Sequence, residues 1–239
     1  SSDLGQKLGD IWGYVTDGFF TSEDDVKNSP NQSAIHAKWN PGDMKYKDLN
    51  NDNRIDWGDN TVNNPGDKKV LGNNTPRFLY GLMFAGQYKD FDFSVFFQGV
   101  GKRDVFIGST TYFGFQGNKY FDNVHEHNMD YWREDNQNAF FARPYSTSEV
   151  SKNQQVQSRF IQNGAYLRLK NLQLGYTLPS ELLQGVGISK LRFYFSGENL
   201  LTFSKLMDGV DPEATSGSWG DAKSYPLSLV CSIGVNLTF

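Results

Sequence analysis

The stretch from Tyr225 to Phe239 constrains the fold more than any other part of the chain. Every second residue from Tyr225 onward is apolar, and most of the residues between are small or polar. Because successive side chains of a β-strand point to opposite faces, this pattern predicts a strand with one wholly apolar face. A strand that crosses an outer membrane needs about 9–11 residues. The alternative is the last strand of a soluble β-sandwich, but the length and the terminal Phe239 favour a membrane strand.

The same two-residue periodicity recurs upstream. The expected strands occupy 76–101, 159–179, 189–204 and 225–239. In the first range, Lys89 and Asp90 separate two alternating runs, which predicts a short hairpin turn. In the second, the apolar positions change parity near Asn171, which predicts a β-bulge. We expect the apolar side chains to form one continuous outer face and charged residues such as Arg168 and Arg192 to face the other way, because a charge in lipid is costly.

The segments between these strands are long and polar. Residues 19–75 and 102–158 are rich in Asn, Asp, Gly and charges with little periodicity, so we expect mainly extracellular loops. The mean hydropathy of −0.57 does not argue against a membrane protein, since barrel strands show only alternate residues to lipid. The predicted fold class is all-β: a partial transmembrane antiparallel β-barrel. A lumen wide enough to hold a plug needs about 22 strands, so this chain is expected to combine with others.

The net charge, the first residues and the cysteine count exclude several classes of function and structure. The net charge is −4 and the pI is about 5.4, which argues against nucleic acid as a partner. The first residues lack the basic start and apolar stretch of a signal peptide, so a mature form, a fragment or a cytosolic protein is expected. The single cysteine, Cys231, rules out an internal disulfide. No nucleophile–base–orienter set is visible, so an enzyme is not expected.

One acidic stretch predicts a cation site. Its candidate metal ligands are Asp48, Asn50, Asp52, Arg54, Asp56 and Asp59. They occupy positions 1, 3, 5, 7, 9 and 12 of a calcium-loop register, with Arg54 acting through its backbone carbonyl. Asn53 replaces the usual glycine but tolerates the left-handed conformation, and Asp59 replaces the usual glutamate. The expected ion is a structural Ca2+, and the alternative is a solvated acidic turn.

Aromatic residues in the expected outer loops are candidates for contact with substrate. Trp57, Tyr131, Trp132 and Trp219 could stack on sugar rings, the alternative being the aromatic girdle or the core of a loop. His125 and His127 share a face only in an extended segment, and with no third ligand they are interpreted as part of a solvated loop.

Several motifs resemble the SusC/RagA-type TonB-dependent transporters of Bacteroidetes. The matching stretches, in family order, include residues 41–56, Thr75-Pro76-Arg77-Phe78, Tyr88-Lys89-Asp90-Phe91-Asp92-Phe93-Ser94, Ala165-Tyr166-Leu167-Arg168-Leu169-Lys170-Asn171 and Gly197-Glu198-Asn199-Leu200. The resemblance covers most of 41–105 and 159–239. Phe239 also resembles the terminal aromatic of outer-membrane proteins, which serves as an assembly signal.

The resemblance implies a place and a set of partners. It implies the C-terminal part of one barrel domain in the outer membrane, with the plug domain not in this chain. It implies import of oligosaccharides, or in some members peptides, powered through TonB, which would act through the missing N-terminal part. The implied partners are a SusD-like surface lipoprotein, outer-membrane lipid, the substrate, and the remaining strands and plug. A soluble, calcium-stabilised glycan-binding module is the alternative, and the direction of the apolar faces separates the two.

Overall fold

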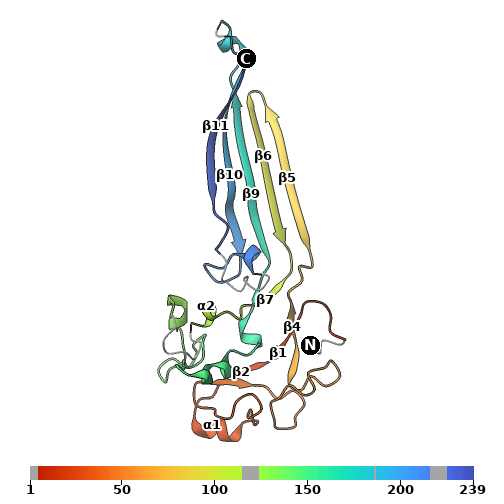
Figure 1. Cartoon of the computed structure of the whole chain (residues 1–239), viewed down its shortest axis with the longest axis vertical. Coiled ribbons are helices and arrows are strands. Elements are labelled where there is room, and N and C mark those ends of the chain that lie inside the picture. The colour runs from red at the N-terminus through yellow and green to blue at the C-terminus, as the bar shows by residue number, and fades with distance from the viewer. Residues whose placement is uncertain (1–4, 115–123, 186, 216–224) are drawn as a thin grey trace. The chain divides into compact units, whose positions relative to one another are not determined.

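The computed structural model describes residues 5–114, 124–185, 187–215 and 225–239, which form two compact units (Figure 1). The first unit is built mainly from residues up to Thr75 and from 104–162. The second consists of 76–103, 163–213 and 225–239. Among the described residues, no helix is long and apolar enough to cross a membrane.

The second unit is a single five-stranded antiparallel sheet in the order β11-β10-β9-β6-β5. Its strands are β5 (Leu79–Tyr88), β6 (Phe91–Val100), β9 (Tyr166–Thr177), β10 (Lys190–Ser204) and β11 (Val230–Thr238). Each strand pairs with the strand that precedes or follows it along this unit, as the adjacent arrows in Figure 1 show. All five lie within the ranges in which alternation of apolar residues predicted strands.

The two ends of this sheet differ in the length of the connections between their strands. At one end Lys89 and Asp90 alone join β5 to β6, with Lys89 at φ 52, which confirms the predicted hairpin turn. The β9–β10 connection lies at the same end and contains η4 (Ser180–Leu183). At the other end the β6–β9 and β10–β11 connections are much longer. We call these the short-connection end and the long-connection end.

Bulges near the middle of the sheet account for the change of parity in the sequence. Phe96 pairs with Asn171 but Phe97 pairs with Leu169, so Lys170 is an extra residue in β9. At the same level the register of β10 jumps from Glu198 to Leu201. An extra residue moves every later side chain to the opposite face. The predicted bulge is therefore confirmed, and it keeps the apolar residues of β9 on one face.

The first unit holds short paired strands around an aromatic core. β1 (Asp10–Tyr14) pairs with β4 (Lys68–Asn73), β2 (Thr16–Phe19) with β3 (Met44–Tyr46), and β7 (Asp104–Phe106) with β8 (Ile161–Asn163). The core includes Tyr14, Phe20, Tyr46, Ile107, Tyr112 and Phe160. The rings of Tyr14 and Tyr46 lie 5.0 Å apart between centroids.

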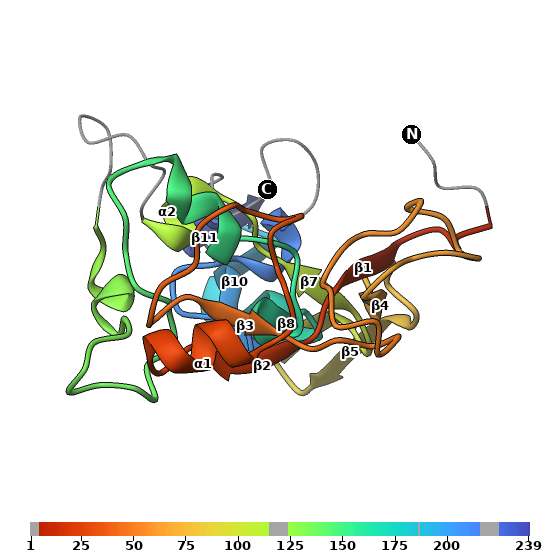
Figure 2. The ribbon, with the colours of Figure 1, turned by 90° about the horizontal axis from the view of Figure 1, so that it is seen from below.

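Short helices complete the first unit. They are α1 (Glu23–Asn28), α2 (Thr110–Phe113), η1 (Glu126–Met129), η2 (Ser148–Asn153) and η3 (Ser158–Phe160). Ser22 caps α1 by accepting a hydrogen bond from the Asp25 amide at 3.1 Å. Lys45 of β3 forms an ion pair with Asp25 at 2.8 Å, which fixes α1 beside this strand (Figure 2). Residues 19–75 and 102–158, expected to be mainly loops, thus contain short strands and helices with buried side chains. Strands of three to six residues are too short for their periodicity to stand out.

Candidate functional site on a two-faced sheet

The five-stranded sheet has one apolar face that continues across every strand. Residues that pair directly point to the same side of a sheet. One row runs through Gly86, Phe93, Leu174, Phe195 and Ile233, and each pairs with the next. The neighbouring row runs through Tyr88, Phe91, Tyr176, Phe193 and Val235. This apolar face confirms the predicted continuous face.

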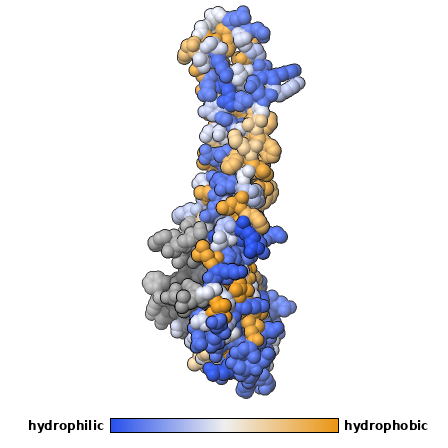
Figure 3. All heavy atoms as spheres, turned by 90° about the vertical axis from the view of Figure 1, so that its right-hand side faces the viewer, coloured by the Kyte–Doolittle hydropathy of each residue, from blue (hydrophilic) through white to orange (hydrophobic). Residues whose placement is uncertain are grey.

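The apolar face is exposed within the described residues. Ile233 is 85% exposed, and Phe84, Phe91, Phe93 and Phe193 are also exposed. Apolar side chains gather along one side of the strands in Figure 3. A contiguous apolar patch larger than a few hundred Å² is rare on soluble monomers and marks a membrane or partner surface. The face is therefore built to be covered by something other than water.

The opposite, polar face carries an ion pair that passes over a glycine. Arg192 of β10 donates from Nε to Asp92 Oδ2 at 2.8 Å and from Nη2 to Oδ1 at 2.5 Å, across the intervening β9. Gly175 of β9 lies beneath it, and a Cβ at that position would sit 2.4 Å from both partners. Glycine is required here because the two charged side chains occupy the space of any side chain. Arg192 lies on the polar face, as predicted.

A second charged cluster lies on the polar face toward the long-connection end. Arg168 of β9 is only 3% exposed and pairs with Asp211 at 2.7 Å and Glu213 at 2.8 Å. Lys170 pairs with Glu213 at 3.1 Å. Burial alone would raise the pKa of Asp211, but hydrogen bonds from the Leu227 and Glu213 amides and from Arg168 hold the pKa below its ordinary value. Asp211 and Glu213 were not foreseen as partners of Arg168.

The acidic loop adopts tight turns held by its own side chains. Asp48 accepts hydrogen bonds from the amides of Asn51 and Asn53 at 2.6 and 2.8 Å. Asn53 adopts the left-handed conformation at φ 62, as predicted for position 6. Asp52 accepts from the Arg54 amide at 2.8 Å. Each carboxylate has about four acceptor sites, so these amide contacts leave lone pairs for other ligands.

The remaining candidate ligands also have protein partners. Asp56 accepts from the Gly58 amide at 2.8 Å, and Asp59 from the Asn64 side chain at 2.9 Å. Asn50 accepts from the Asp52 amide at 3.0 Å. Within the described ranges, no three His, Cys, Asp or Glu side chains are arranged to hold a metal ion. Asn and backbone oxygens lie outside that set, so the calcium site stays a prediction.

Asp67 is a buried carboxylate beside this loop that the sequence analysis missed. It accepts from the Leu49 amide at 2.8 Å and the Asp56 amide at 2.9 Å. Burial raises its pKa, and the negative charges of Asp48 and Asp52 raise it further. Asp67 therefore connects both ends of the loop, and its spacing from the register gave no signal in the sequence.

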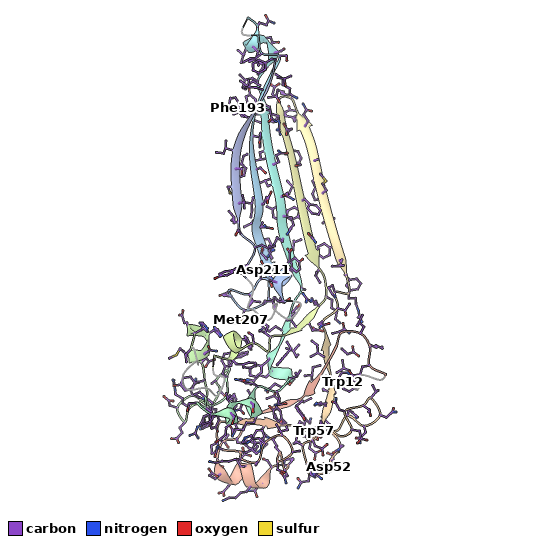
Figure 4. All side chains as sticks on the ribbon, viewed as in Figure 1. Trp12, Asp52, Trp57, Phe193, Met207 and Asp211 are labelled. Carbon is purple, nitrogen blue, oxygen red and sulfur yellow. The ribbon has the colours of Figure 1, made fainter. Side chains whose placement is uncertain are left out.

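The aromatic candidates differ in what they show to solvent. Trp57 is 45% exposed and lies in the first unit (Figure 4). Tyr131 is half-buried, with the Arg133 guanidinium 5.1 Å from its ring centroid. Trp132 is only 6% exposed and packs close to Gly42, so its ring is part of the core. Trp219 lies outside the described residues.

The terminal Phe239 and the histidine pair at 125 and 127 were also singled out in the sequence. Phe239 is 86% exposed and directly follows β11. His125 and His127 stack at 5.7 Å, and His127 Nε2 lies 2.9 Å from the Tyr112 carbonyl oxygen. The second contact gives His127 a structural role in the first unit.

Comparison with known proteins identifies proteins similar to this chain over most of its length. No family model matches the chain. The TonB-dependent receptor P3 of Formosa agariphila is 29% identical over 247 residues, which cover 98% of this chain and 22% of that protein. The TonB-dependent receptor SusC of Bacteroides thetaiotaomicron is 28% identical over 215 residues, covering 87% of this chain and 19% of SusC. Over most of its length the chain is similar to TonB-dependent receptors of the SusC type. It spans about a fifth of the length of these relatives.

A solved structure shares the fold. The RagAB peptide transporter superimposes with a TM-score of 0.66 at 19% identity, over 96% of this chain and 22% of that one. At this identity the likeness shows the fold alone. These similar proteins are named as receptors and transporters, not as enzymes.

Proposed function

We propose that this chain forms five consecutive wall strands, with their outer loops, of an outer-membrane importer of bulky nutrients. The continuous apolar face carries the proposal, because a lipid bilayer covers such a face without a second protein layer. In a soluble glycan-binding module the same side chains would be packed against another sheet. The charged pairs Arg192–Asp92 and Arg168–Asp211 on the opposite face fit a water-filled or protein-filled lumen.

The free edges of the sheet support a larger barrel. Within the described residues β5 pairs only with β6, and β11 only with β10. Each unpaired backbone group in lipid costs several kcal/mol, so membrane sheets close on themselves. We propose that further strands of the parent protein pair with both edges, in a plugged barrel of about 22 strands.

The ends of the sheet suggest its orientation. Outer-membrane barrels have short turns on the periplasmic side and long loops outside. The short-connection end would then face the periplasm, and 19–75 and 102–158 would lie outside. The exposed Phe239 would serve as the assembly signal, so that deleting it lowers the surface level of the parent protein.

The transport partners follow from the relatives and are proposed on that basis. RagAB is described as a peptide transporter, and SusC is a TonB-dependent receptor. We propose import of oligosaccharides or peptides, with energy delivered by TonB to a part of the parent outside this chain, and a SusD-like lipoprotein on the outer surface. Trp57 is the aromatic candidate best placed to stack on a sugar. Copurification of such a lipoprotein with the tagged parent tests the partnership.

Labelling of neighbouring cysteines tests the membrane assignment directly. Cys231 lies on the apolar face and Ser232 on the polar face of β11. In intact outer membranes a water-soluble maleimide should label native Cys231 at least about tenfold more slowly than Ser232→Cys in a Cys231→Ser chain, because a polar reagent stays out of hydrocarbon. Both should label alike in denaturant. Equal labelling of the two cysteines in membranes would contradict a lipid-facing role.

We also propose that residues 48–59 bind a structural calcium ion. The left-handed Asn53 and the fully buried Ile55 at position 8 support the loop register. Hydrogen exchange of this loop should slow several-fold when calcium replaces a chelator, because the ion would bridge carboxylates that otherwise repel. Asp52→Ala should abolish that difference, and Asp59→Ala should reduce it least. No calcium effect on the unmodified loop would refute the proposal.

A further inference from the structure

The turn at Asp211, Pro212 and Glu213, which we call the junction, contacts β9 and the segments that flank β6 and β11 in the second unit. Asp211 is 7% exposed, and its Oδ1 receives Arg168 Nη2 of β9. The Pro212 carbonyl accepts from Arg103 Nη1, beyond the end of β6, at 3.2 Å. The junction begins η5 (Pro212–Ala214) and belongs to the β10–β11 connection. Figure 4 places Asp211 toward the opposite end of the strands from Phe193.

The same Asp211 carboxylate also holds the approach to β11. Its Oδ2 accepts from the Leu227 amide at 2.8 Å, and its Oδ1 accepts from the Glu213 amide at 2.9 Å. One residue further on, the Ser228 carbonyl accepts from Asn199 Nδ2 of β10 at 3.1 Å. The chain entering β11 is therefore fastened at two successive residues before the first rung of the ladder.

Contacts of this kind are needed to fix the register of β11 against β10. A two-residue hairpin turn fixes the register of its strands, as Lys89 and Asp90 do for β5 and β6. The β10–β11 connection is long, so it imposes no register by turn geometry. A slip of one residue would turn the apolar side of β11 to the polar face, but a slip of two would preserve the alternation. Alternation alone therefore does not select the observed pairing of Ser196 with Ser232.

We propose that Asp211 is a positioning residue that sets the register of β11 against β10 by joining the Leu227 amide to Arg168. A carboxylate suits this role because all its sites accept hydrogen bonds. It receives the Arg168 guanidinium and the Glu213 amide on one oxygen and Leu227 on the other. An asparagine would turn an NH2 group toward one of these donors. This role of Asp211 lies within the sheet itself and does not depend on transport.

Engineered disulfides measure the register. In the full-length parent with Cys231→Ser, the directly opposed pair Ser196→Cys and Ser232→Cys reports the observed register. Ser196→Cys with Val230→Cys reports a slip of two residues. We expect the opposed pair to oxidise at least about tenfold more completely than the offset pair, because disulfides require Cα atoms within about 7 Å. Adding Asp211→Asn should lower this ratio at least about threefold.

Asp208→Asn is the matched control, since Asp208 is an exposed carboxylate in the same connection. It should leave the ratio unchanged. If Asp211→Asn prevents folding, Asp211→Glu decides, because it keeps the charge but moves the carboxylate by one methylene. Glutamate should still lower the ratio. A ratio within twofold of the Asp208→Asn control, in whichever Asp211 variant folds, would overturn the proposal.

Discussion

The two units are stabilised in different ways. The first unit buries aromatic side chains such as Tyr14, Tyr46 and Phe160, together with a fully buried ion pair between Lys152 and Asp43 at 2.7 Å. The second unit exposes most of its large apolar side chains and keeps its charged pairs on one face of a single sheet. The first unit thus resembles a water-soluble fold with its own core, whereas the second depends on its surroundings to cover its apolar face.

The largest expected effect is in the first unit, at its buried ion pair. Lys152→Met removes one charge and leaves Asp43 buried without its cation, which should cost about 3–5 kcal/mol. Lys45→Met, which breaks the partly exposed pair with Asp25, should cost only about 0.2–1 kcal/mol. Hydrogen exchange across residues 38–46 and 148–157 measures both. If the two substitutions were equally mild, the stability of the first unit would not depend on its buried Lys152–Asp43 pair.

An intermediate effect is expected in the second unit at Gly175. Gly175→Ala places a methyl group where the Arg192–Asp92 pair crosses β9, and such overpacking costs about 1–3 kcal/mol. Gly81→Ala in β5 is the control, because the nearest neighbour of the added methyl group would be a Phe96 ring carbon at 3.2 Å. Replacing glycine by alanine within a strand also contributes about 0.5–1 kcal/mol of stability, which offsets the cost of this contact. The effects of the two substitutions are compared by measuring the denaturation midpoint of each variant of the parent protein in detergent. Equal tolerance would mean that the ion pair contributes little to the sheet.

The smallest effect is the acid sensitivity of α1 in the first unit. Burial alone would raise the pKa of Asp25, but hydrogen bonds from Lys45, Thr21 and Ser29 lower this pKa below its ordinary value. A depressed pKa stabilises the fold above the unfolded value and loses that contribution as the pH falls through the folded value. Amide protection of 21–29 should therefore decrease below about pH 4. Asp25→Asn should remove this pH dependence, whereas the exposed Asp24→Asn should leave it unchanged.

The sequence predicted the second unit well because alternation is a local signal. The strands, the Lys89–Asp90 turn and the bulge at Lys170 all follow from residues a few positions apart. The junction was not predictable in this way, because Arg168 and Asp211 are distant in the chain. The residues next to either one do not indicate which residue it pairs with. In the first unit, strands of three to six residues are too short to show a period. The burial of Trp132 depends on its approach to Gly42, which the sequence does not encode locally.

The crossing of Arg192 and Asp92 over Gly175 also bears on how this sheet can evolve. A side chain at 175 is compatible with the fold only after the charged pair has been lost, and the pair can arise only where 175 is already glycine. The three positions should therefore change in a fixed order during divergence, with the glycine gained first and lost last. Among homologous sequences, chains that keep both charges but carry a larger residue at 175 should be rare.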